Sequence, residues 1–288
     1  MKVSMLLATL NRRELMLNAI QSILCQNYQE FEIIVIDQSD VENSDIVELD
    51  SRIRYFHIAE RGLSRARNIG LKYITGDIVG LMDDDAVYPE DVLNKVNELF
   101  SRNNNLGLIS GAVVDKSTNR ISLRGMGDCH KKIDKKNIFQ CCISPSMFIR
   151  KDIFDSDEFD EQLGLGNYWG SAEETDIALK VLYRNYEALF CPDIVVYHPG
   201  CDKKDLPFSK LESYSRGFGA VCAKHFNLYD NKVMHHLYKK SIFRAIGGYC
   251  LSILKFSSHM RKYYKISMRA KREGYKSYKY QLREKNDS

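Results

Sequence analysis

The first hundred residues alternate between short apolar runs and segments whose apolar residues recur at helical spacing. The runs predict strands that are buried on both faces, and the helical spacing predicts helices between them. The predicted strands are Val3–Leu10, Phe31–Ile36, Ile53–Ile58 and Asp77–Met82, and the predicted helices are Glu14–Cys25 and Leu63–Ile74. This alternation indicates an α/β fold with a mainly parallel sheet covered by helices on both faces.

The pattern is less regular beyond residue 100. Residues 115–137 are polar and predict a loop, Ala172–Asn185 predicts a helix, and Ile194–Tyr197 predicts a short strand. From about residue 211 the spacing is helical to the end of the sequence. We therefore expect two parts, an α/β domain over residues 1–210 and a helical extension over residues 211–288.

The net charge of +4 conceals an asymmetry between the last 58 residues and the rest of the chain. Residues 231–288 hold 15 Lys and Arg against 3 Asp and Glu, whereas residues 1–230 hold 27 basic and 35 acidic residues. A basic extension on an acidic body indicates a polyanionic partner or an anionic membrane surface. No recognised nucleic-acid-binding motif accompanies the charge, so we expect no nucleic-acid partner.

The eight cysteines include no C-x-x-C pair, which argues against a zinc ribbon or a thioredoxin-like site. The sequence starts directly on a strand-like stretch without a signal peptide, and no apolar run approaches the ~20 residues of a spanning helix. These features predict reduced thiols in a cytoplasmic protein.

Three adjacent carboxylates, Asp83, Asp84 and Asp85, directly follow the last predicted strand of the first hundred residues. Adjacent carboxylates repel one another unless a cation neutralises them, and Mg²⁺ and Mn²⁺ prefer oxygen ligands. A solvated acidic turn, or caps for a following helix, is the alternative interpretation. The carboxyl ends of parallel strands share one rim, so Thr9, Asn11, Asp37 and the three aspartates are expected to converge there.

Three further segments carry candidate chemistry. In Glu173-Glu174-Thr175-Asp176 a carboxylate could act as a general base, although acidic residues also suit the first turn of a helix. His198 follows a predicted strand and is either a metal ligand or a structural histidine. The segment Gly62–Gly70 places basic residues at the start of a helix, where they could meet phosphates or simply line an amphipathic helix.

In order along the chain, these motifs resemble the family-2 glycosyltransferases of bacterial polysaccharide synthesis, which have the GT-A (Rossmann-like) fold. The resemblance runs from Lys2 to about His198 and is carried by the segments Ala8–Arg12, Val35–Asp37, Gly62–Asp85, Gly170–Asp176 and Tyr197–Pro199. Arg216–Ala220 with Lys224-His225, and Arg272–Tyr275, are similar to the C-terminal extension of some capsular and exopolysaccharide members.

The resemblance implies a role for each matching residue. Thr9, Asn11 and Asp37 would hold the nucleoside, Arg67 would lie near the diphosphate or donor sugar, and Asp84 would contact ribose. Asp83 and Asp85 would form the D-x-D motif that binds Mg²⁺ or Mn²⁺, with His198 completing the metal shell. Glu174 stands where the family's usual base is aspartate, so Glu173 and Glu174 both remain candidates and Glu174 is preferred.

The resemblance also implies the reaction and the partners. A sugar would pass, with inversion at its anomeric carbon, from a nucleoside-diphosphate sugar, expected to be a UDP-sugar, to a lipid-linked saccharide acceptor. Two alternatives share the fold. A sugar-1-phosphate nucleotidyltransferase is disfavoured because Ala8–Arg13 lacks the glycines of a triphosphate-binding loop, and a non-catalytic binding module is disfavoured because none of the acidic motifs is lost.

The extension predicts peripheral contact with the inner face of the cell membrane. Ile242, Ile246, Tyr249, Ile253 and Phe256 fall at helical spacing, and Arg244 and Lys255 interrupt an apolar stretch that is too short to span. Further along, lysines and arginines alternate with tyrosines, a composition typical of the interface of an anionic bilayer. A helix packed on the α/β domain, with a solvated basic face, is the alternative.

Overall fold

The computed structural model describes residues 1–118, 120–121, 129–200 and 206–287. The chain forms two compact units. Unit 1 comprises residues 1–159 and 177–200, and unit 2 comprises residues 160–176 and the segment after Gly200. The division falls inside helix α5 (Glu173–Tyr183), so the segment that carries Glu173 and Glu174 belongs to unit 2.

Unit 1 is built on one mixed sheet in the order β3-β2-β1-β4-β8-β5-β9-β7, with β6 paired to β5. Strands β1, β2, β3 and β4 are parallel to their neighbours in this group, and β5 is parallel to β9. Strands β6, β7 and β8 pair antiparallel. The strands are β1 Val3–Thr9, β2 Phe31–Asp37, β3 Ile53–His57, β4 Ile78–Asp83, β5 Leu106–Asp115, β6 Arg120–Ile121, β7 Lys131–Lys132, β8 Met147–Arg150 and β9 Glu187–Tyr197.

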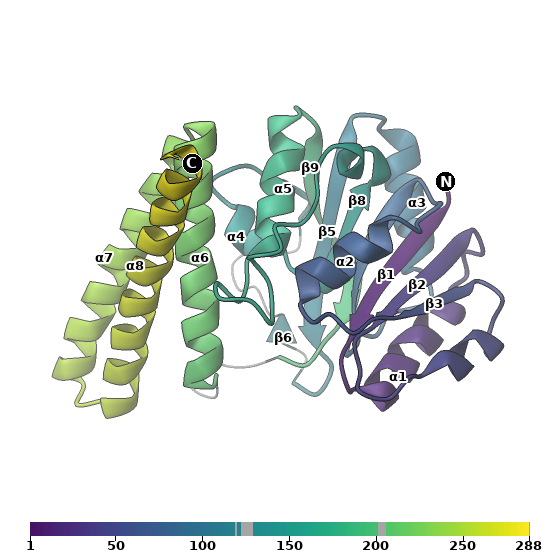
Figure 1. Ribbon diagram of the computed structural model, residues 1–288, viewed down its shortest axis with the longest axis horizontal. Helices are drawn as coiled ribbons and strands as arrows, with labels where there is room; N and C mark the ends of the chain where they lie inside the picture. The colour runs from purple at the N-terminus through teal and green to yellow at the C-terminus, as the bar shows by residue number, and fades with distance from the viewer. Residues whose placement is uncertain (119, 122–128, 201–205, 288) are drawn as a thin grey trace. The chain divides into compact units, whose positions relative to one another are not determined.

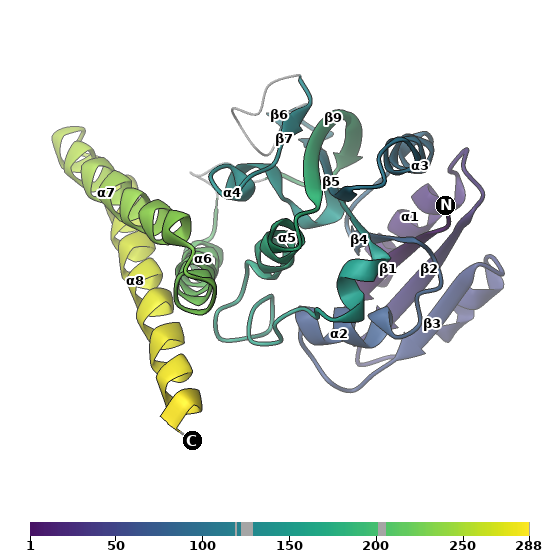
Figure 2. The ribbon, with the colours of Figure 1, turned by 90° about the horizontal axis from the view of Figure 1, so that it is seen from above.

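Helices cover both faces of this sheet, as the alternating pattern predicts (Figure 2). Helices α1 and α3 lie on one face, and α2 lies on the other. The helical segments of unit 1, with α5 shared between the units, are α1 Arg13–Leu24, α2 Leu63–Leu71, α3 Val92–Arg102, α4 Ile138–Cys141, α5 Glu173–Tyr183 and the 3-10 turns η1 Ser44–Glu48, η2 Ser144–Ser146 and η3 Lys151–Asp155. The predicted α/β fold is confirmed.

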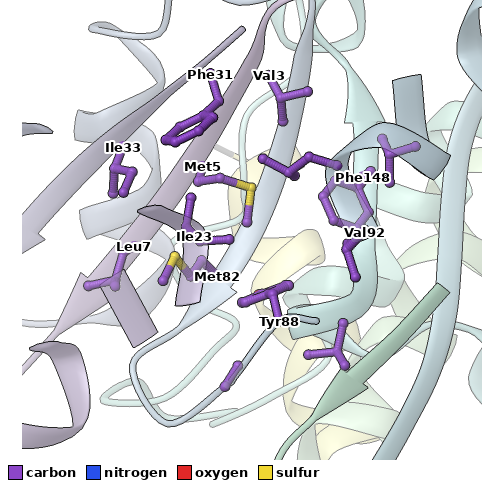
Figure 3. Close-up of a cluster of buried hydrophobic side chains, with 14 of the residues drawn as sticks. Val3, Met5, Leu7, Ile23, Phe31, Ile33, Met82, Tyr88, Val92 and Phe148 are labelled. Carbon is purple, nitrogen blue, oxygen red and sulfur yellow. The ribbon is translucent and has the colours of Figure 1, made fainter. Parts of the chain in front are cut away.

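The core under α1 and α3 follows from strand periodicity (Figure 3). Alternate residues of β1, namely Val3, Met5 and Leu7, point into a cluster with Ile23 and Val92, and all are fully buried. Leu6, between them, is buried as well, because the opposite face of the sheet is covered too. Burial on both faces explains why the strands appear in the sequence as uninterrupted apolar runs.

The middle of the sheet is where the sequence pattern is incomplete. Strand β5 and the first seven residues of β9 were not predicted, and β5 contains Gly107, Ser110 and Gly111, which weaken an apolar run. Their long parallel pairing, from Leu106↔Glu187 to Val114↔Tyr197, joins segments that are about 80 residues apart in sequence. Residues 119 and 122–128 of the predicted polar loop lie outside the described residues.

Unit 2 contains three long helices, α6 Phe208–Tyr229, α7 Lys232–Leu254 and α8 Ser258–Asp287, which lie side by side (Figures 1 and 2). Glycines allow α6 and α8 to approach closely. A Cβ on Gly219 would lie 2.2 Å from the Lys271 carbonyl oxygen, and one on Gly274 would lie 2.0 Å from that of Arg216. Among the described residues, none of the helices is both long enough and apolar enough to cross a bilayer.

Candidate active site

The carboxyl ends of three neighbouring parallel strands bring the predicted site residues of unit 1 to one rim. Thr9 at the end of β1 is paired in register with Asp37 at the end of β2, and Ala8 is paired with Asp83 at the end of β4. Asn11, two residues beyond β1, has φ 56°, and its side-chain amide donates to Asp40 (2.7 Å), three residues beyond β2. The predicted convergence of these strand ends is confirmed.

Asp84 and Asp85 contact the end of β1 and the turn that follows it. The Thr9 hydroxyl donates to Asp84 (2.9 Å), and Arg12 reaches Asp84 (2.5 Å) and Asp85 (2.8 Å) with its two terminal nitrogens. Burial raises the pKa of Asp84, and Thr9 and Arg12 offset only part of this effect. The guanidinium of Arg12 thus partly neutralises the acidic turn.

His198 lies beside Asp85, with its Nε2 3.0 Å from Oδ1 of the carboxylate. A backbone bridge explains this proximity, because Val87 and Tyr197 exchange hydrogen bonds of 2.8 and 2.9 Å and so join the turn after Asp85 to the end of β9. Burial raises the pKa of Asp85, but its hydrogen bonds and charge contacts with His198 and Arg12 outweigh this effect and hold the pKa well below its usual range. Burial lowers the pKa of His198, and Asp85 more than reverses that effect.

Asp83, the first of the three aspartates, contacts Ser144 and Arg67. Its Oδ1 accepts a hydrogen bond from Ser144 (3.1 Å) and lies 3.3 Å from Nη2 of Arg67. Arg67 is fully buried, also donates to Ser144, and has its guanidinium 5.5 Å from the centre of the Phe159 ring. The structure therefore places Arg67 next to Asp83 rather than on an exposed helix face.

Asp37 is fully buried, and protein groups satisfy its carboxylate. It accepts hydrogen bonds from the Ser39 backbone N–H (2.9 Å), the Asn43 amide (2.8 Å) and the Tyr55 hydroxyl (2.8 Å). These bonds outweigh the effect of burial and lower its pKa. A nucleoside that contacts Asp37 has to share or displace one of these donors.

Asp83, Asp85 and His198 form a set of possible metal ligands. One donor atom from each residue lies within 4.8 Å of the others, and all three residues are partly accessible. Two carboxylate oxygens and one imidazole nitrogen are ligands that Mn²⁺ accepts, and the carboxylates also suit Mg²⁺. The residues present therefore fit the divalent cation that the sequence predicts.

Glu173 and Glu174 occupy the first turn of α5, as predicted. Glu173 is only 4% exposed, whereas Glu174 is partly exposed. The turn is entered through Ala172, whose φ of 75° is unfavourable for a residue with a Cβ. Such strain is often retained at functional sites.

A family model, "Glycosyl transferase family 2", matches residues 4–156. This match includes β1 to β4, the acidic turn and more than half of the chain. The chain belongs to glycosyl transferase family 2.

Curated relatives of this glycosyltransferase align over part of their length. An uncharacterised glycosyltransferase of Rickettsia felis is 33% identical over 107 residues, which are 36% of this chain and 18% of the relative. A GalNAc(5)-diNAcBac-PP-undecaprenol β-1,3-glucosyltransferase of Campylobacter jejuni is 28% identical over 177 residues, which are 56% of this chain and 55% of the relative. The chain thus spans less than a fifth of the first relative and about half of the second.

Solved structures share the fold. The mannosyltransferase PcManGT of Pyrobaculum calidifontis, in complex with GDP-Man and Mn²⁺, has a TM-score of 0.67 at 15% identity, covering 95% of this chain and 86% of the neighbour. TarS 1–349 of S. aureus, in complex with UDP-GlcNAc, has a TM-score of 0.62 at 17% identity, covering 79% and 67%. At these identities the likeness establishes the GT-A architecture and no residue role.

Two residues of the acidic cluster were not singled out from the sequence. Arg12 follows Asn11 directly in the first motif, so its position beyond a strand end was a usable signal for contact with the rim. Ser144 lies in the 3-10 turn η2 about 60 residues after Asp83, and no local pattern connects the two. Only the pairing of β8 with β4 and β5 brings this turn to the cluster.

Proposed function

We propose that this family-2 glycosyltransferase transfers a sugar from a nucleoside-diphosphate sugar, a UDP-sugar in the first instance, to a hydroxyl of a lipid-linked saccharide, with inversion at the anomeric carbon. The observation that carries the proposal is the set of Asp83, Asp85 and His198 at the rim of a GT-A sheet. Support for the substrates comes from the relative named for an undecaprenol-linked acceptor and from the neighbour that binds UDP-GlcNAc.

The proposed mechanism assigns one task to each group. Asp83, Asp85 and His198 would hold Mg²⁺ or Mn²⁺, which when bound stabilises the charge of a diphosphate leaving group. Thr9, Asn11 and Asp37 would orient the nucleoside, and Asp84 the ribose. Arg67, held beside Asp83, would add positive charge near the phosphates or the donor sugar.

The proposed base is in the first turn of α5. Glu174 would take the proton from the acceptor hydroxyl as its oxygen bonds to the anomeric carbon and the bond from that carbon to the diphosphate breaks. One base and one displacement produce inversion. Glu174 is preferred to Glu173 because it is the less buried of the two.

A donor screen tests this function. The full chain is incubated with UDP-, GDP- and dTDP-sugars, with Mn²⁺, with Mg²⁺ or with EDTA, and release of the nucleoside diphosphate is measured. We expect release from one UDP-sugar with metal and little with EDTA. Release of pyrophosphate from a sugar 1-phosphate and a nucleoside triphosphate would instead identify a nucleotidyltransferase, and binding of no nucleotide sugar would contradict the proposal.

We also propose that unit 2 contacts the anionic inner face of the cell membrane. Between Asp230 and Glu273 the sequence holds 11 Lys and Arg and no Asp or Glu. Six apolar residues in the second half of α7 and in the turn after it are exposed, and we call them the α7 ridge: Phe243, Ile246, Leu251, Ile253, Leu254 and Phe256. Exposed apolar groups beside cations fit the interface of an anionic bilayer.

The exposed residues of the α7 ridge differ from the membrane-facing residues that the sequence predicts. Ile242 is only 9% exposed, because with Ala245 and Ser252 it lies on the side of α7 that packs within the unit. The prediction was therefore wrong for Ile242. Among the residues of unit 2 whose burial the structure describes, Phe256, Leu254 and Phe243 are instead the most exposed large apolar side chains, at 90%, 75% and 70%.

Removing two ridge side chains is expected to weaken binding to anionic vesicles. Leu254→Ser with Phe256→Ser should lower partitioning onto phosphatidylglycerol vesicles by about tenfold or more, because each buried side chain contributes roughly 1.5–3 kcal/mol when fully inserted. Binding of the unaltered chain should fall with salt without vanishing, since screening affects only the cations. Vesicle sedimentation measures both effects.

The matched control is Val41→Ser, which removes an apolar side chain that is 76% exposed in unit 1 and should leave vesicle binding unchanged. If the unaltered chain does not bind anionic vesicles at low salt, the membrane proposal is wrong. If it instead forms dimers that the ridge substitutions dissociate, the ridge is a contact between two copies.

A further inference from the structure

Helix α6 holds the segment that carries the proposed base. Asp176, two residues after Glu174 in the first turn of α5, is fully buried. Its Oδ1 lies 2.8 Å from the ammonium nitrogen of Lys224 and 2.9 Å from Nε2 of His225, both on α6. His225 is also fully buried, and Lys224 is 6% exposed.

Lys224 also contacts the first residue of this segment, which comprises residues 160–176. The Lys224 ammonium also lies 2.8 Å from Oδ2 of Asp160, which accepts a hydrogen bond from the Tyr278 hydroxyl on α8 (3.2 Å). Burial lowers the pKa of Lys224, but the two carboxylates outweigh this effect and raise it, so the side chain remains a cation. A buried cation between two carboxylates fixes the distance between the two ends of segment 160–176.

A second contact with α6 lies on the other side of Glu173 and Glu174. The Ser213 hydroxyl donates to the Gly170 carbonyl (2.9 Å), and a Cβ on Gly217 would lie 2.4 Å from the Ser171 carbonyl oxygen. The backbone of the segment therefore packs directly on the helix. The strained Ala172 lies between this contact and the two glutamates.

We infer that Lys224 and His225 are positioning residues for the reaction, acting on Glu174 through Asp176. The inference rests on the proposed function, because it needs the base in the first turn of α5. The two contacts with α6 lie on either side of Glu173-Glu174, so the direction in which these carboxylates project is set by the C-terminal helices. In addition to any contact with a membrane, unit 2 is thereby part of the catalytic machinery.

Lys224→Met tests the inference, because it keeps an unbranched side chain that is one atom shorter and removes the charged ammonium group. We expect kcat to fall by about 10- to 100-fold, since a displacement of the order of 1 Å can lower a rate by that factor. The KM of the UDP-sugar selected by the donor screen, and the affinity for UDP with Mn²⁺, should change little. Lys224→Arg, which retains the cation, should recover part of the rate.

The matched control is Lys210→Met, which removes an exposed cation from the same helix and should leave kcat unchanged. Thermal melting and UDP binding establish that each variant is folded. If Lys224→Met is not folded, His225→Gln provides the same test, because its amide can still donate a hydrogen bond but from a shifted position. An unchanged kcat in the folded variant overturns the inference.

A double-mutant cycle separates positioning from general destabilisation. In a Glu174→Gln background the base is already lost, so Lys224→Met should cause almost no further loss of rate. Equal losses in both backgrounds would show that Lys224 acts independently of the base and would overturn the inference. If Glu174→Gln and Glu173→Gln are each fully active alone, the base assignment itself fails, and those single variants show it without reference to Lys224.

Discussion

Glu174→Gln is expected to lower the rate of sugar transfer by about 10²–10⁴-fold, the range that a general base contributes. The substitution keeps the shape of the side chain and removes its ability to accept the proton of the acceptor hydroxyl. Affinity for UDP with Mn²⁺ should be retained, because the candidate nucleotide and metal ligands belong to unit 1. Steady-state kinetics and calorimetric titration with UDP and Mn²⁺ check the two parts.

Glu173→Gln is the matched control for this substitution. It alters the neighbouring carboxylate, which is 4% exposed, in the same turn of α5. We expect a smaller loss of kcat than for Glu174→Gln. If Glu173→Gln is the inactive variant and Glu174→Gln retains its rate, the base is Glu173, and if both retain their rates neither residue is the base.

Asp85→Ala is expected to remove the effect of Mn²⁺ on UDP binding. Asp85 is the aspartate that lies closest to His198, and their approach at 3.0 Å defines the candidate metal site. With one ligand gone, Mn²⁺ should no longer raise the affinity for UDP, and kcat/KM should fall by about 10²-fold or more, since metal stabilisation of a leaving group is worth several kcal/mol. Chelation should abolish transfer by the unaltered chain.

Asp91→Ala is a suitable control because the Asp91 carboxylate is exposed, pairs with Lys95 and is not among the proposed ligands. It should leave metal-dependent UDP binding intact. Asp85→Ala also removes the partner of Arg12, so His198→Ala, which leaves that pair in place, distinguishes loss of a metal ligand from release of Arg12. Full transfer by Asp85→Ala in the presence of chelator would exclude the metal assignment.

The C-terminal unit has two proposed roles that can be tested independently. Membrane contact depends on the exposed ridge of α7, and positioning of the base depends on the buried face of α6. Leu254→Ser with Phe256→Ser should therefore lower vesicle binding without lowering kcat on a soluble donor. Lys224→Met should have the opposite pattern, because its side chain is buried and contributes nothing to the surface charge.

The sequence by itself determined the first half of the sheet and the acidic end of β4. Strands β1, β2 and β4 are covered on both faces, so their residues form apolar runs that are visible without any partner. Because parallel strands expose their carboxyl ends at one rim, the convergence of Thr9, Asp37 and Asp83 also followed from local pattern. The family resemblance added the roles, which no pattern of hydrophobicity contains.

Only the tertiary structure decided which distant residues join this rim. His198 reaches Asp85 through the Val87–Tyr197 bridge and the pairing of β9 with β5, and Ser144 reaches Asp83 through the placement of β8. Likewise, no local sequence pattern predicts the ion pair between Asp176 and Lys224, which lies 48 residues further along the chain. Strand pairing and buried ion pairs depend on partners that are remote in sequence, whereas local periodicity reports only whether a face is covered and not by what.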